Sequence, residues 1–231
     1  MNSNLALQST PMIKDTPWDN KVFGFYTAEI LEYSARTLEQ AIRRPGHYTL
    51  KLNPLADKSL ALQYGFYFCD TLLEPVCKQG DLVLSNHPDI HIMDDVPLGE
   101  LLKICDGAFH NGRFHRDPYI EKKLADKRYL QWLEDLAGRG KIYSLMLGEH
   151  IAGFIATNNN QLQLHAIANE YRGKGLAKYW WSAVSNKLFE NGYETVSSSI
   201  SSSHLPVLNL YAGLGFKFTN SMDIYHLLVK P

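Results

Sequence analysis

The chain has 231 residues, of which 45% are hydrophobic and 20% charged, so it can bury a sizeable core as one large domain or two small ones. Its net charge of −1, with 23 scattered basic residues, argues against nucleic acid as the main partner. No apolar run approaches the roughly 18 residues of a membrane span, and no leader-like segment begins the chain, so we expect a cytoplasmic protein without membrane contact.

The cysteines and histidines indicate neither a disulfide framework nor a metal site. Cys69, Cys77 and Cys105 lack CxxC spacing, and their number is odd, so we expect small buried core residues. The nine histidines form no metal-binding motif. We therefore expect no metal.

The first clear element in chain order is a helix after Asp117-Pro118, which reads as an N-cap and first turn. Its apolar face would contain Tyr129, Trp132, Leu133 and Leu136. Just before it, Arg113, His115 and Arg116 are cations that could bind a diphosphate or could remain solvated loop charges. We take Arg113 and His115 as candidate substrate-binding residues.

The second half has a regular order of predicted elements. Two strands joined by a tight turn are followed by a third strand, and then helix, strand, helix and strand alternate. The predicted ranges are 141–147, 151–157, 161–168, 175–190, 194–201, 205–214 and 216–229. This alternation of strands and helices indicates an α/β (α+β) fold.

The loop between the third strand and the next helix has the features of an anion site. Tyr171-Arg-Gly-Lys-Gly-Leu-Ala177 has two glycines and two cations before a helix whose first amides are free. A P-loop is excluded because Gly175 follows Lys174, and a dinucleotide fingerprint is excluded because Lys178 stands where a small residue is needed. An ordinary glycine turn remains the alternative.

Arg172-Gly-x-Gly-x-Ala177, with its flanks, resembles the acyl-CoA-binding motif of the GCN5-related N-acetyltransferases, from about Lys141 to the C-terminus. The resemblance implies the fold of that family, a central mixed, mostly antiparallel sheet flanked by helices, with acetyl-CoA as cosubstrate. The third strand would pair with the pantetheine arm, the loop would hold the pyrophosphate, and the N–H of Ile167 would face the thioester oxygen. The implied cofactor-binding residues are Leu164, Ala166, Ile167, Ala168, Arg172, Gly173, Lys174, Gly175, Leu176, Ala177 and His204.

The resemblance also implies catalytic residues. Tyr211, four residues before Gly215-Phe216, would protonate the departing CoA thiolate, which a phenol can do. His204 replaces the asparagine that many family members have seven residues before this tyrosine, so its contact with pantetheine is open. His165, on the strand beside the acetyl group, is a candidate base, although it could instead be a core histidine or leave the role to water.

The first half contains an echo of the C-terminal motif. Gln63-Tyr-Gly-Phe-Tyr-Phe aligns with Gly213-Leu-Gly-Phe-Lys-Phe, which suggests a partial duplication whose N-terminal copy has Ala61 in place of Tyr211; chance similarity is an equal alternative. We predict an N-terminal α/β acceptor-side domain over residues 1–90, which could be a degenerate acetyltransferase-like half, and an acetyltransferase domain over 91–231.

Two N-terminal patterns refine the substrate class. Trp18-Asp-Asn-Lys-Val-Phe-Gly-Phe25 and Arg113-Phe-His-Arg-Asp117 are similar to those of nucleotide-linked 4-amino-sugar acetyltransferases of the dTDP-fucosamine type. The resemblance implies a small-molecule nucleotide-sugar acceptor and a role in cell-surface polysaccharide biosynthesis. Acetylation of a peptide N-terminus or a polyamine, and a non-catalytic acyl-CoA-binding module, are the alternatives. The aromatic-rich first half could also form a homodimer surface.

Overall fold

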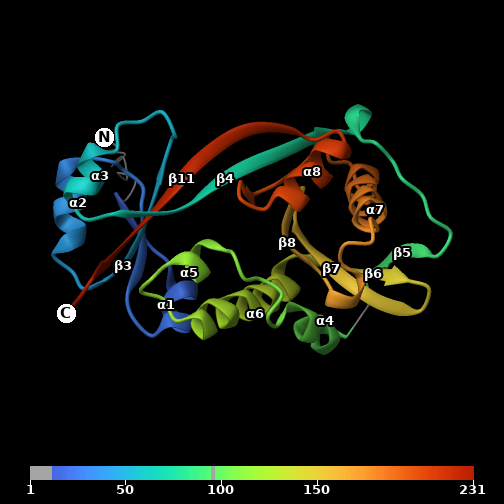
Figure 1. The fold of residues 1–231 in the computed structure, drawn as a ribbon, viewed down its shortest axis with the longest axis horizontal. Coiled ribbons are helices and arrows are strands. Elements are labelled where there is room, and N and C mark those ends of the chain that lie inside the picture. Colours follow the sequence, from blue (N-terminus) through green and yellow to red (C-terminus); the bar gives the residue numbers. More distant parts are fainter. Residues whose placement is uncertain (1–11, 95–96) are drawn as a thin grey trace, which may run out of the picture. The chain divides into compact units, whose positions relative to one another are not determined.

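A computed structural model describes residues 12–94 and 97–231 (Figure 1). The chain forms two compact units, which we call the first unit (Met1–Phe68 with Ile224–Pro231) and the second unit (Cys69–Asp223). This division follows contacts within the chain and differs from the predicted boundary after residue 90, which stays a prediction. Among the described residues, no helix is long and apolar enough to cross a membrane.

The first unit is a small α/β layer. Its strand β1 is antiparallel to β2, β2 is parallel to β3, and β3 neighbours the end of β11. Its core includes Leu38, Tyr48, Leu50 and Leu227. The elements are β1 (Ile13–Asp15), α1 (Pro17–Phe23), β2 (Thr27–Ile30), α2 (Ala35–Ile42), β3 (Gly46–Leu52), α3 (Ser59–Gln63) and the first residues of β4 (Tyr67–Lys78), completed by the last residues of β11 (Lys217–Val229).

The second unit is built on a sheet in the order β4-β9-β8-β7-β6-β5, and β10 also pairs with β4. The β8–β9 pair is parallel, while the pairs β4–β9, β7–β8, β6–β7 and β5–β6 are antiparallel. After β4 its elements are η1 (Gln79–Asp81), β5 (Ile90–Met93), α4 (Leu98–Cys105), α5 (Arg113–Arg116), α6 (Lys122–Arg139), β6 (Lys141–Leu147), β7 (His150–Asn158), β8 (Gln161–Ile167), η2 (Asn169–Tyr171), α7 (Ala177–Glu190), β9 (Thr195–Ser198), β10 (Ile200–Ser201), α8 (Leu205–Gly213) and most of β11. The predicted mixed, mostly antiparallel sheet flanked by helices is confirmed.

Helices cover both faces of this sheet. One core joins Leu133 and Leu136 of α6 to Phe154 and Leu164 of the sheet. The other core joins α7 and α8 to the opposite face, and its largest buried side chains include Trp180. The sheet is therefore the middle layer of three.

An extra residue in β8 decides which way its side chains point. The register against β7 pairs Ala156 with Leu164 but Thr157 with Leu162, so Gln163 is the residue that the bulge accommodates. Leu162 consequently joins the core under α7, whereas Leu164 joins the core under α6. His165, one residue beyond Leu164, then faces the α7 side.

Three local predictions need correction. The helix expected to begin at Asp117 begins at Lys122, because Asp117 instead closes a turn in which its Oδ1 accepts the N–H of Tyr119 at 2.9 Å. The cations expected on a loop before it lie on the short helix α5. The predicted strand 194–201 is also interrupted, because β9 pairs with β8 and β4, while β10 is a separate strand that pairs with β4.

The two Gly-Phe segments that resemble each other in the sequence also have the same local geometry. The N–H of Phe66 bonds to the carbonyl of Ala61 at 2.9 Å after α3, and the N–H of Phe216 bonds to the carbonyl of Tyr211 at 3.1 Å after α8. The intervening Gly65 and Gly215 have φ of 81° and 88°. Each turn leads into a long strand, β4 or β11. The local geometry agrees with a duplication, which stays a hypothesis.

Candidate active site

The sheet of the second unit opens between β8 and β9. These strands pair at Gln161 with Ser197 and at Leu162 with Ser198, and Ser198 Oγ donates to the Leu162 carbonyl at 2.8 Å. Over residues 12–94 and 97–231 the register contains no β8–β9 pair beyond these two. The backbone of β8 past Leu162 therefore has an edge that an extended ligand could pair with.

Ile167 lies at the end of that edge. The next residue, Ala168, donates its N–H to Ala152 of β7 at 2.8 Å. Because successive amides of a strand point in opposite directions, the N–H of Ile167 points away from β7, toward the opening. Its predicted role toward the thioester oxygen stays a prediction.

The glycine loop follows directly and leads into α7. Gly173 and Gly175 have φ of 72° and 71°, a conformation that side chains with a Cβ rarely adopt. No side chain caps α7 in the described chain, so the amides of its first turn are left for an anion. Arg172 donates Nε to the carbonyl of Ile167 at 2.7 Å, which fixes the loop against the end of β8.

Tyr211 and His165 meet on the α7 side of the opening. Tyr211 Oη and His165 Nε2 are 3.3 Å apart, and the His165 ring meets the Trp181 ring edge to face, with 5.0 Å between centroids. Burial raises the pKa of Tyr211 to about 12. Burial, and to a lesser extent the charge of His204, lowers the pKa of His165 to about 4. A neutral His165 can accept the phenol hydrogen bond and orient Tyr211.

His204 is the first residue before α8 and is exposed. Its pKa is lowered by partial burial and, next, by the charge of Arg172. The charge of His204 thus acts on His165, and the charge of Arg172 acts on His204. The exposed apolar Leu205 adjoins it.

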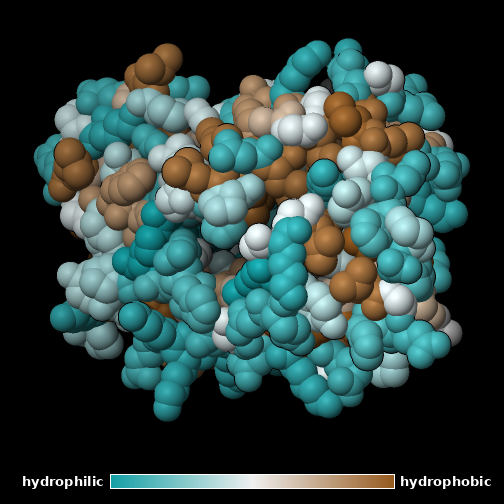
Figure 2. Space-filling model, turned by 45° about the vertical axis from the view of Figure 1, so that its right-hand side comes forward, coloured by the Kyte–Doolittle hydropathy of each residue, from teal (hydrophilic) through white to brown (hydrophobic). Residues whose placement is uncertain are grey.

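The surface view gives the wider context of these residues. Figure 2 shows a face that is largely hydrophilic, with hydrophobic side chains gathered in separate patches. Large apolar side chains that remain exposed in the second unit include Val83, Leu84, Leu205 and Phe218. Leu205 is 61% exposed, so the N-terminus of α8 offers an apolar contact as well as a polar one.

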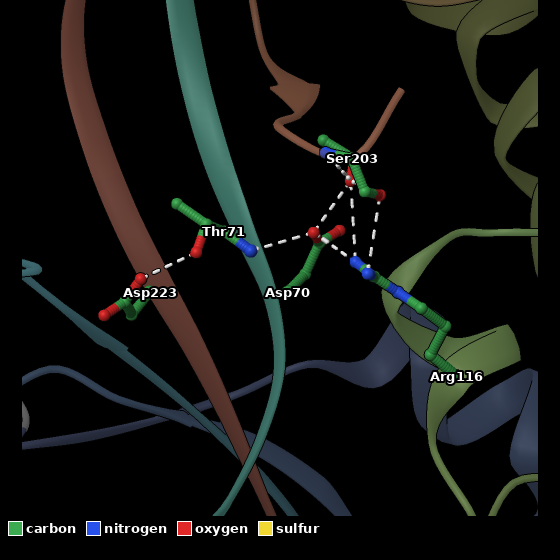
Figure 3. A network of polar contacts seen from close by, with 6 residues as sticks. Asp70, Thr71, Arg116, Ser203 and Asp223 are labelled. Carbon is green, nitrogen blue, oxygen red and sulfur yellow. Dashed lines mark hydrogen bonds and ion pairs between the residues drawn. The ribbon is translucent and has the colours of Figure 1, made fainter. Parts of the chain in front are cut away.

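A second group of polar residues connects β4, α5 and the turn after β10 (Figure 3). Buried Asp70 forms an ion pair with Arg116 and accepts hydrogen bonds from Ser201 Oγ and the Thr71 N–H, both at 2.8 Å. Arg116 also donates to Ser203 Oγ at 3.4 Å. This network fixes α5 beside the turn that carries His204. Sequence reasoning missed Asp70, because nothing in the sequence indicates which cation a strand carboxylate meets.

The predicted acceptor-side residues lie on α5. His115 is buried, and its Nε2 is 3.0 Å from Asp126 Oδ1 of α6. Its ring stacks on Tyr129 with centroids 5.6 Å apart. The Arg113 guanidinium lies over the Phe114 ring at 4.7 Å. Both residues are thus fixed by packing, and their predicted role in acceptor binding stays a prediction.

Comparisons with known proteins identify the domain. Residues 119–225 match the family described as "Acetyltransferase (GNAT) domain". Residues 119–225 are therefore a GNAT acetyltransferase domain. The prediction of an N-acetyltransferase is confirmed at this level, and GNAT enzymes use acetyl-CoA as the acyl donor. No curated protein sequence matches the chain.

Solved structures share the fold of the GNAT domain and its N-terminal extension. A GCN5-related N-acetyltransferase from Sphaerobacter thermophilus is similar with TM-score 0.62 and 11% identity, covering 95% of this chain and 76% of that one. A GCN5-related N-acetyltransferase from Kribbella flavida gives TM-score 0.56 and 12% identity, with 87% and 80% covered. A tandem GNAT protein from the clavulanic acid biosynthesis pathway gives TM-score 0.55 and 13% identity, with 89% and 76% covered.

Most of the predicted donor-side residues of the GNAT domain are thus contiguous in the fold. The end of β8, the glycine loop and the N-terminus of α7 follow one another. Tyr211 reaches His165 from α8, and His204 lies at the start of the same helix. Leu164 and Ala166 differ, because their side chains belong to the core under α6, and only their backbone could contact a cofactor.

Proposed function

We propose that the GNAT domain transfers the acetyl group of acetyl-CoA to the amino group of a nucleotide-linked amino sugar by direct attack on the thioester. The observation that carries the proposal is the opening between β8 and β9 beside the uncapped N-terminus of α7. A backbone edge next to an anion site suits the pantetheine and the pyrophosphate of CoA.

On the donor side, the backbone of residues 164–168 binds pantetheine and the loop Arg172–Ala177 binds the pyrophosphate. Lys174 contributes charge to that loop, and His204 contacts the pantetheine arm. The N–H of Ile167 donates to the thioester oxygen, on which negative charge develops in the tetrahedral intermediate. The direction of this N–H, away from β7, supports the assignment.

Tyr211 is the general acid that protonates the CoA thiolate. A phenol with a raised pKa stays protonated at neutral pH and can hand its proton to the departing sulfur. His165 was a candidate base, but its lowered pKa makes it a poor proton acceptor, and its bond to Tyr211 suits a positioning role.

The charge of the acceptor side supports an anionic acceptor. Residues 113–128 contain six Lys or Arg against three Asp or Glu, a formal charge of +3. A diphosphate is attracted to such a segment, with Arg113 as a candidate contact, whereas a polycationic polyamine is repelled. A peptide N-terminus remains the alternative acceptor.

A thiol-release assay tests the proposal. Acetyl-CoA is supplied with dTDP- and UDP-linked 3-amino and 4-amino sugars, with spermidine and a peptide N-terminus as comparison acceptors. We expect turnover on an amino sugar only. The Tyr211→Phe variant should lose at least about 100-fold in turnover while binding acetyl-CoA as tightly as the wild type.

Three other outcomes would change the conclusion. Turnover on the peptide or spermidine would replace the acceptor class. Acetyl-CoA binding without turnover on any acceptor would favour a non-catalytic acyl-CoA-binding module. Full turnover by Tyr211→Phe would remove Tyr211 as the acid.

A further inference from the structure

The proposed reaction needs a proton acceptor that the donor side does not supply. An amine attacks a thioester only when it is neutral, so the acceptor ammonium must first lose a proton. His165 is held by Tyr211 and resists protonation, so the base must lie elsewhere. Within the described residues of the second unit, the histidine with a buried side chain is His115, on α5.

His115 has the arrangement of a general base held by a carboxylate. Its side chain is only 3% exposed, and Nε2 lies 3.0 Å from Asp126 Oδ1. A carboxylate at this distance keeps the ring proton on Nε2 and leaves the lone pair on Nδ1. That Nδ1 atom is buried and has no hydrogen-bond partner among the described residues.

The ring is also fixed in orientation. It is stacked on Tyr129, with an angle of 13° between the planes, and Tyr129 in turn stacks on Phe109 with centroids 4.3 Å apart. A buried polar atom without a partner costs stability, because it has given up its bonds to water, so a function would explain why it is retained. An imidazole with one nitrogen bonded to a carboxylate and the other left unpaired suits proton transfer.

The network of Figure 3 places α5 beside the proposed site. Arg116, the residue after His115, binds Asp70 of β4 and donates to Ser203, which directly precedes His204. The helix that carries His115 is therefore attached to the turn that begins α8, the helix of Tyr211. Asp70 and Arg116 act here as positioning residues.

We propose that His115, oriented by Asp126, is the general base that removes the proton from the acceptor ammonium; this inference rests on the proposed function. The ammonium gives one proton to Nδ1, directly or across one water, and the freed amine forms the C–N bond to the thioester carbon. The C–S bond breaks and the sulfur takes the Tyr211 proton. The second proton lost by the nitrogen restores the phenol through solvent, and the proton on His115 leaves to solvent.

Charged and titratable groups around the His115 ring would influence this transfer. Asp126 and Tyr129 of α6 contact the ring itself. Arg113 and Arg116 lie on the same short helix, Arg128 lies over the Phe114 and Tyr129 rings, and Cys105 of α4 lies near Asp126.

The test compares His115→Gln with His110→Gln. Glutamine can still donate an N–H to Asp126 but has no basic nitrogen, and His110 is an exposed histidine of the same segment that makes no part of the proposed site. We expect His115→Gln to lower kcat/KM about 100-fold or more at neutral pH. The deficit should shrink as the pH rises, because the amine then arrives neutral without help. Acetyl-CoA affinity and His110→Gln turnover should match the wild type.

A second variant covers the case in which His115→Gln is unstable. Asp126→Asn nearly preserves size but can donate to Nε2, which moves the ring proton to Nδ1 and removes the lone pair. It should show the same loss, largest at neutral pH.

A loss equal at every pH would indicate a structural role and overturn the inference, as would turnover of both variants equal to that of His110→Gln. In either case a wild type active on an amino sugar leaves the proposed function standing. A wild type inactive on every acceptor would overturn both.

Discussion

Replacing Arg116 by methionine removes the charge that compensates a buried carboxylate. Asp70 is 2% exposed and Arg116 is 32% exposed, so the pair lies at the edge of the core. Losing one partner of a buried ion pair costs about 3–5 kcal/mol, because the remaining charge is desolvated without compensation. We expect about 3 kcal/mol, the lower end, since Ser201 and the Thr71 N–H still bond to Asp70 and water reaches the position of Arg116.

The change can be measured by urea unfolding and by thermal melting. For a chain of this size each kcal/mol lowers the Tm by about 2–4 °C, so Arg116→Met should melt about 6–12 °C below the wild type. The control is Lys103→Met, which breaks the exposed Lys103–Glu100 pair of α4 at 2.7 Å. An exposed pair contributes about 0–1 kcal/mol, so this variant should melt close to the wild type.

The double variant Asp70→Asn/Arg116→Met separates charge from packing. It removes both charges, and the amide oxygen at position 70 can still accept from Ser201 and Thr71. We expect it to recover to within about 1 kcal/mol of the wild type. The reasoning fails if Arg116→Met costs no more than Lys103→Met, or if the double variant is as unstable as the single one.

Three further outcomes are expected. Gly175→Ala should weaken acetyl-CoA binding in calorimetry and cost about 1–2 kcal/mol of stability, because φ is 71°, whereas Gly138→Ala in α6 should leave binding unchanged. Urea unfolding between pH 6.5 and pH 4 tests the lowered pKa of His165. In this window the unfolded wild type takes up a proton at His165 and the folded protein does not, so its free energy of unfolding falls with pH, and His165→Gln should reduce that fall. An equal pH dependence in both proteins would contradict the lowered pKa. Burial raises the pKa of both the Cys69 and the Cys105 thiol to about 12. Both cysteines should therefore resist alkylation at mildly alkaline pH until urea unfolds the chain, and rapid labelling of the native protein would show that this reasoning is wrong.

The sequence predicts the elements of the second half well because their signals are local. Periodic apolar residues, Gly148 and Asn191-Gly192 define β6, β7, β8 and α7 to within about two residues of the structure. The glycine loop is equally local, since two positive φ values need two glycines. The bulge in β8 is not local: it depends on the register with β7, and so the side of the sheet that His165 faces could not be read from alternation alone.

The acceptor side was harder to predict because its interactions join distant positions. Asp70 meets Arg116 and Ser201 across 46 and 131 positions of the chain, and no pattern marks such a pair. From the sequence, His115 is a candidate substrate contact or a solvated loop charge beside Arg113 and Arg116, and nothing in the sequence indicates its partner Asp126, eleven positions away on another helix. A run of charged residues in a sequence shows the sign of the charge but not which residues pair with it. The fold was therefore needed to distinguish a cation at the surface from a buried, oriented base.

The segment β2–α2–β3 of the first unit and the segment β8–α7–β9 of the second have the same local order. Comparing the starts of their helices explains why an anion site is expected in the second unit. Both β2 and β8 are followed by a helix and then by a parallel neighbour, β3 or β9. At the start of α2, however, Ser34 Oγ accepts the N–H of Thr37 at 3.3 Å, and Glu32 precedes it, so that helix end is already capped and lies near a negative charge. α7 begins with no side-chain cap among the described residues and with Arg172 and Lys174 before it. An anion would therefore compete with a built-in cap at α2 but would find free amides at α7, which is why the CoA site is proposed in the second unit.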